Sequence, residues 1–93
     1  MDKVSLPETV EQVVRLLKSL VAKDEQQKIA AMPESELVML HFGLGQWIRN
    51  NMELWNGNPQ LMAATGEHDP DDASGVIIRA FWQQLQDELP KVH

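Results

Sequence analysis

The sequence contains no cysteine and no tyrosine, and its lysines and arginines form no cluster. Without cysteine the chain has neither disulfides nor thiolate metal sites, which suits a reducing cytoplasm. Without a basic cluster no surface follows a phosphate backbone, so we expect no nucleic-acid partner. The formal net charge of −6 instead indicates a soluble, acidic protein.

Long hydrophobic runs and strand patterns are missing as well. Charged residues interrupt the apolar stretches, so we expect no membrane-spanning helix. The start, MDKVSLPETV, lacks the apolar region of a signal peptide. Apolar and polar residues do not alternate, so no strands are predicted. The 93 residues, 43% of them hydrophobic, suffice for one small domain.

Apolar residues recur instead at three- and four-residue steps, which predicts a compact all-α bundle over residues 1–93. We expect three main helices and two short ones, at about residues 6–22, 24–31, 33–51, 59–65 and 70–89. The 33–51 helix is apolar on most sides, since its stripe is widened by Val38, Met39, Phe42 and Trp47. We therefore predict that this helix lies at the centre of the bundle.

Four residues are predicted to cap helices, because their side chains accept hydrogen bonds from free backbone N–H groups. Ser5 begins an SLPE capping box, and Asp69 precedes a proline at the start of the last helix. Asp24 and Asn58 stand in the same position before the two short helices.

Two glycines interrupt the predicted 33–51 helix. Gly43 and Gly45 each cost about 1 kcal/mol relative to alanine in a helix interior. Close approach of a neighbouring helix would offset that cost. We expect Ser74 and Gly75 of the last helix to face them across one tight crossing.

The stretch GLGQWIRNNMELW holds two of the three tryptophans, Trp47 and Trp55, on either side of Arg49 and Asn50. Trp47 is predicted to be core, and the asparagines of this stretch to satisfy carbonyls at the helix end. Arg49 lies at the helix C-terminus, where the helix dipole stabilises a positive charge.

Two interpretations of Arg49 stay open. In one, it forms an ion pair with Asp71 or Asp72 and ties the 33–51 helix to the start of the last helix. In the other, Arg49, Asn50 and these acids line a solvent-filled cleft with ligand-binding or hydrolytic activity. A cleft requires the charged groups to be exposed to water together, whereas a tie requires them to be paired with one another.

Other candidate chemistry is weaker. The acids that begin the last helix match no calcium-loop spacing and suit the helix dipole. Ser74 lacks the frame of a nucleophile elbow. His41 is expected to be a hydrogen-bonded core histidine, and three dispersed histidines without cysteine indicate no metal site. The sequence thus indicates no catalytic residue, no metal and no cofactor, and we do not expect an enzyme.

Two blocks, LHFGLGQWIRNNMELW and HDPDDASGVII, resemble the signature of a small bacterial family of uncharacterised proteins. That signature has an LGxWIRNN block ending in LW and then a PDDxSG block, and the likeness runs from Leu40 to Ile78. In the family a histidine often directly precedes the proline; here Asp69 intervenes, so His68 is given no role. The resemblance implies no activity. It implies one constellation made of Trp47, Arg49, Asn50, Trp55, Pro70, Asp71, Asp72 and Ser74.

Together these features favour a cytoplasmic protein–protein interaction module with an unknown protein partner. Trp55 and Trp82 are its candidate anchors, because tryptophan dominates interface hot spots. An immunity- or antitoxin-like inhibitor of a basic partner is a specific version of this function. A homodimer through the edge at Trp82 is a further alternative.

Overall fold

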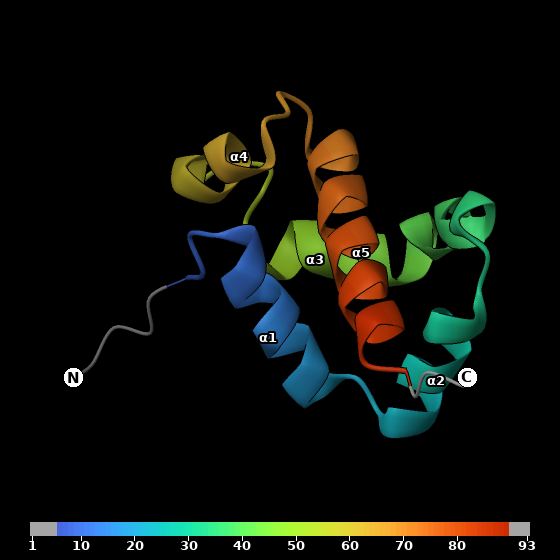
Figure 1. Ribbon diagram of the computed structural model, residues 1–93. Coiled ribbons are helices and arrows are strands. Elements are labelled where there is room, and N and C mark those ends of the chain that lie inside the picture. Colours follow the sequence, from blue (N-terminus) through green and yellow to red (C-terminus); the bar gives the residue numbers. More distant parts are fainter. Residues whose placement is uncertain (1–5, 90–93) are drawn as a thin grey trace.

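The computed structural model describes residues 6–89, and this part of the chain is all-α, as predicted (Figure 1). The predicted cap Ser5 lies outside the described residues. Within 6–89, no helix has both the length and the apolar character needed to cross a bilayer. The helical segments are α1 (Val10–Leu20), α2 (Lys23–Ala31), the 3-10 helix η1 (Glu34–Leu40), the π-helical turn η2 (His41–Gly45), α3 (Gln46–Asn51), α4 (Pro59–Thr65) and α5 (Pro70–Asp87).

The last helix, α5, is the centre of the fold. It contacts each of the other helical segments, and Figure 1 shows it crossing the middle of the molecule in front of α3. Its inward face buries Ile77, Phe81 and Leu85 in the same core as Val13 and Leu17 of α1. Because α5 is long and meets every neighbour, it aligns the shorter segments around it.

The segment predicted as one central α-helix over residues 33–51 is instead η1, η2 and α3 in succession. A 3-10 helix winds more tightly than an α-helix, and a π turn more widely. Val38, Met39 and Phe42 point away from the core, and Phe42 is 81% exposed. Trp47 lies at the surface edge and is not core. This segment therefore covers one side of α5, and the prediction that it is the central helix is wrong.

The first helix begins at Val10, later than the predicted start near residue 6, because a capping box formed by Thr9 and Gln12 sets its start. Thr9 Oγ1 accepts a hydrogen bond from the Gln12 backbone at 3.1 Å, and the Gln12 side chain accepts one from the Thr9 backbone at 3.2 Å. Pro7 precedes the helix and is not part of its first turn. The box at Thr9 satisfies two free backbone donors of α1.

The predicted cap at Asp24 is wrong. Helix α2 begins at Lys23, its N-cap is Ala22, and no side chain caps it. Asp24 lies inside the first turn, where its charge still suits the positive end of the helix dipole.

Side chains of α5 hold the carboxyl end of α2. Trp82 Nε1 donates to the Met32 carbonyl at 2.9 Å, and the Gln86 side chain donates to the Ala30 carbonyl. Carbonyls at the end of a helix lack partners within that helix, so these two bonds satisfy groups that α2 leaves open. The first of these bonds uses the indole N–H of Trp82, a half-buried residue.

The end of α5 is joined to α1 through an ion pair between Lys18 and Glu88. The hydrogen bond from Lys18, followed by one from Gln84, lowers the pKa of the Glu88 carboxyl below its ordinary value of 4.5. Lys18 of α1 therefore has a specific partner at the end of α5.

Asn58 lies at the predicted N-cap of α4 and joins three segments. Its Oδ1 accepts from the Leu61 backbone at 3.2 Å. Its Nδ2 donates to the Met52 carbonyl at 2.9 Å and to the Pro7 carbonyl at 3.0 Å. The side chain is buried, so the bonds to Leu61 and Met52 form away from water, and the bond to Pro7 is partly buried.

Asn58→Ala is expected to lower the free energy of unfolding by about 2–3 kcal/mol, because it removes a cap and takes the donor from the buried Met52 carbonyl and the partly buried Pro7 carbonyl. Asn56→Ala is the matched control, since Asn56 is an exposed residue of the same turn. Urea unfolding of both variants measures the difference, and equal losses would contradict the role of Asn58.

Candidate functional site

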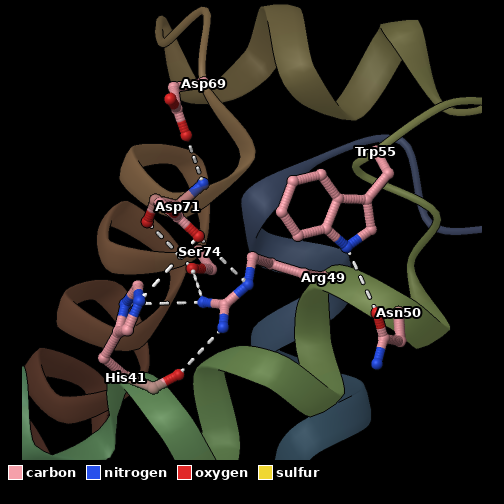
Figure 2. Close-up of polar contacts among 7 residues, drawn as sticks. All are labelled: His41, Arg49, Asn50, Trp55, Asp69, Asp71 and Ser74. Atoms are coloured by element: carbon pink, nitrogen blue, oxygen red, sulfur yellow. Dashed lines mark hydrogen bonds and ion pairs between the residues drawn. The ribbon is translucent and has the colours of Figure 1, made fainter.

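Arg49 is the centre of a buried polar cluster between η2 and the start of α5 (Figure 2). Its Nη1 donates to Ser74 Oγ at 2.9 Å and its Nη2 to the His41 carbonyl at 3.2 Å. Its Nε lies 3.3 Å from Asp71 Oδ1. This last contact is an ion pair in which the N–H direction falls outside hydrogen-bond geometry. The side chain is only 6% exposed. Its charge is paired with Asp71 and its two terminal nitrogens donate to protein groups, as burial requires, whereas the buried Nε makes the ion pair without a hydrogen bond.

Ser74 is fully buried in the first half of α5. Its hydroxyl accepts from Arg49 and donates to the Asp71 carbonyl at 2.9 Å. Both roles of the hydroxyl are thus used within the protein. A hydroxyl in this position has no path to a substrate and serves as an acceptor for the guanidinium.

His41 belongs to the same cluster but lies half-exposed, so its prediction as a core histidine is wrong. Its Nδ1 lies 3.4 Å from Arg49 Nη1, and its Nε2 lies 3.8 Å from Asp71 Oδ1. Because a guanidinium only donates, the contact between Nδ1 and Nη1 is a hydrogen bond only in the tautomer that carries its proton on Nε2, the nitrogen that faces Asp71. The ring also meets Phe42 edge-on, with centroids 5.0 Å apart.

Gly45 makes room for the guanidinium. A Cβ at this position would lie 2.9 Å from Arg49 Nη1 and 3.4 Å from Ile78 Cδ1. The predicted tight crossing of two glycine-containing helices is wrong, because Gly43 and Gly75 have no atom within 4 Å of such a Cβ. Side-chain crowding therefore explains Gly45 alone.

Asn50 and Trp55 form a second group, on another side of α3 from the guanidinium (Figure 2). Trp55 Nε1 donates to Asn50 Oδ1 at 3.2 Å, and the Trp55 residue is 60% exposed. The role expected for the asparagines at the helix end is performed by Asn51, which donates to the Trp47 carbonyl at 2.9 Å. Asn50 instead fixes the indole.

The remaining predicted residues belong to neither group. Trp47 lines a separate apolar groove of about 600 Å³ with Leu20 and Leu44. Asp72 is exposed and makes no ion pair with Arg49. Asp69 accepts from the Asp71 backbone at 2.7 Å and begins α5, followed by Pro70. The single constellation implied by the resemblance is therefore divided in space.

Sequence reasoning missed His41 and Gly45 as members of the Arg49 cluster. A signal was present, because the two residues precede Arg49 by eight and four positions, a spacing that places all three on one helix face. Among residues 6–89, no three acidic or histidine side chains are arranged to hold a metal ion.

Residues 6–85 match the family described as "Domain of unknown function (DUF6794)". No curated protein and no solved structure matches the chain. The family match is wider than the two blocks that carry the resemblance, and it includes both groups of the candidate site.

Arg49→Ala is expected to lower the free energy of unfolding by about 2–4 kcal/mol, because buried acceptors lose their donor and a cavity forms. Asp71 is half-exposed and becomes hydrated, which limits the loss. Arg79→Ala is the matched control. Its Nε lies 3.2 Å from Glu34, but its side chain is 68% exposed, so we expect a loss of about 1 kcal/mol or less. Equal losses in urea unfolding would contradict a buried tie.

Gly45→Ala and Gly43→Ala are expected to change stability in opposite directions. At Gly45 the added methyl presses on a guanidinium that its contacts with Ser74, His41 and Asp71 hold in place, which costs about 1–3 kcal/mol. At Gly43 the methyl meets nothing, and alanine stabilises the helical backbone by up to about 1 kcal/mol. Thermal unfolding measures both, and shifts of the same sign would show that the crowding at Gly45 is unimportant.

Proposed function

The chain belongs to the family described as a domain of unknown function (DUF6794), and we propose that it is a protein–protein interaction module anchored by Trp55. One observation carries the proposal: the Trp55 indole is largely exposed, yet its orientation is fixed by Asn50. An exposed tryptophan held in one position loses little conformational entropy when a partner covers it.

The turn after α3 holds Trp55 in place. Glu53 adopts φ of 54° directly after the helix, and the Leu54 backbone donates to the Arg49 carbonyl at 3.0 Å. This is the longer of the two backbone hydrogen bonds of a Schellman motif, in which the residue after the cap is left-handed. The Leu54 side chain is buried, which anchors the backbone next to Trp55. The hydrogen bond from the indole to Asn50 then holds the Trp55 side chain.

A cavity of about 660 Å³ opens beside the indole. Trp55, Pro59 and Met62 contribute apolar surface to its lining, and His68 and Glu67 contribute polar groups. A volume of this size accommodates side chains of a partner next to the indole. Aromatic anchors beside such pockets dominate the binding energy of protein interfaces.

Burial of the Arg49 cluster favours this function over a ligand-binding or hydrolytic cleft. Such a cleft requires Arg49 to meet solvent and Ser74 to meet substrate. Arg49 is instead surrounded by its protein partners, and Ser74 has no exposed surface. Trp82, the other candidate anchor, already uses its N–H within the fold, so the proposal rests on Trp55.

The composition supports two further parts of the proposal. A net charge of −6 suits a basic partner. An immunity- or antitoxin-like inhibitor of such a partner is therefore a specific version of the proposed module. The absence of cysteine suits a cytoplasmic location.

The test is selection of displayed random linear peptides against the immobilised protein. Peptides selected on the wild type are expected to bind Trp55→Ala about 30-fold more weakly, the loss of a hot spot. Asn50→Ala frees the indole and is expected to weaken binding about 3- to 10-fold. Both residues are exposed, so the variants keep a melting temperature near that of the wild type.

Leu20→Ser is the control, because Leu20 is an exposed apolar residue on the separate groove beside Trp47. It is expected to leave peptide binding unchanged. Peptides that lose binding to Leu20→Ser but not to Trp55→Ala would overturn the proposal, as would failure to select any Trp55-dependent peptide.

A further inference from the structure

A second depression, here called the acidic groove, runs along α5 beside η1 and has a volume of about 850 Å³. We propose that it binds a basic segment of the same partner protein, with lysine or arginine side chains paired to Asp72 and Glu67. This inference rests on the proposed interaction function and specifies the chemistry of the partner. The carboxylates that line the groove are Glu34, Glu67, Asp71 and Asp72.

The pairing of these carboxylates leaves two of them available. Asp71 is paired with Arg49, and Glu34 is paired with Arg79. Within residues 6–89, neither Asp72 nor Glu67 forms an ion pair. Two carboxylates on one groove of an acidic protein attract positive charge and repel anionic surfaces such as nucleic acid and membranes.

Apolar side chains form the floor of the same groove. Leu37 and Ile78 are buried, and Val76 is half-buried. Val38, on the η1 side, is left exposed. Lysine and arginine lay their methylene stems on apolar surface while their charged ends remain near carboxylates or water. An apolar floor with a carboxylate rim thus fits a basic, partly apolar segment better than a small metal ion.

The glycine at position 75 is a further argument that a segment binds in the groove. It lies inside α5, where glycine is less stable than alanine. No contact within the described protein explains it, because a Cβ there would meet no atom within 4 Å. It lines the acidic groove together with Asp71, Asp72 and Arg79. A bare backbone at this position widens the groove and lets a bound chain approach α5 closely.

The acidic groove and the cavity beside Trp55 have one lining residue in common. Glu67, in the connection between α4 and α5, lines both. One extended partner segment can therefore place an apolar side chain against the indole and basic side chains in the groove. Glu67 therefore lies where such a segment would pass from the cavity to the groove along α5.

The peptides selected through Trp55 provide the test, and they are expected to be enriched in lysine and arginine. Glu67→Gln and Asp72→Asn are each expected to weaken binding about two- to fivefold at low salt, and the effect is expected to fade near 1 M salt. Replacing the basic residues of the peptide with glutamine should produce the same loss. Glu11→Gln is the control, since it removes one exposed carboxylate from α1, and it should leave affinity unchanged.

Gly75→Ala gives a readout that a purely structural glycine would not. It is expected to raise the melting temperature by roughly 4–8 °C and to weaken peptide binding about fivefold or more by narrowing the groove. A raised melting temperature with unchanged peptide affinity would contradict the proposal that a segment binds in the acidic groove.

Failure of the groove proposal and failure of the proposed function give different results in these experiments. Trp55-dependent peptides that lack basic residues and ignore Glu67→Gln and Asp72→Asn would overturn the groove and leave the interaction module standing. Equal weakening by Glu11→Gln would show that net charge, and not the groove, selects the peptides. Absence of any Trp55-dependent peptide would overturn the proposed function itself.

Discussion

The buried guanidinium of Arg49 is the constraint on which the arrangement of η2, α3 and α5 depends. A positive charge removed from water must find an opposite charge and hydrogen-bond acceptors, or it destabilises the fold by several kcal/mol. Asp71 supplies the charge, and Ser74 and the His41 carbonyl supply the acceptors. These groups come from two elements far apart in sequence, so satisfying one side chain fixes the position of η2 against the start of α5.

Local features that look irregular follow from that constraint. The π turn of η2 lies directly before α3, and its first carbonyl, that of His41, accepts from the guanidinium. Gly45 lacks the side chain that would occupy the guanidinium's place. Wide helical turns recur at functional sites in proteins generally. Here the turn has a structural consequence, because it allows an arginine from the next turns of the chain to lie along η2.

The sequence predicted those parts of the fold that depend on neighbours in the chain. Asn58 and Asp69 lie at helix starts with proline directly after them, and the structure has helices there. Two sequence patterns typical of capping boxes, SLPE from Ser5 and TVEQ from Thr9, follow each other and made the start of α1 ambiguous. The prediction of one α-helix over residues 33–51 failed for another reason. The tight winding of η1 and the wide winding of η2 offset each other, so the average number of residues per turn is close to that of an α-helix. Which side of that stripe meets α5 depends on contacts across the chain, and no local pattern contains this information.

The same logic explains why the most conspicuous residues of the sequence do not form one site. Arg49 and Asn50 are adjacent, and a helix directs adjacent side chains about 100° apart. Arg49 therefore turns inward to α5, whereas Asn50 reaches outward to Trp55. The carbonyl of Arg49 also accepts from the turn that carries Trp55, so the inward residue positions the outward one through the backbone. Stability and recognition are then physically linked at α3, although they use different side chains and different faces of the helix.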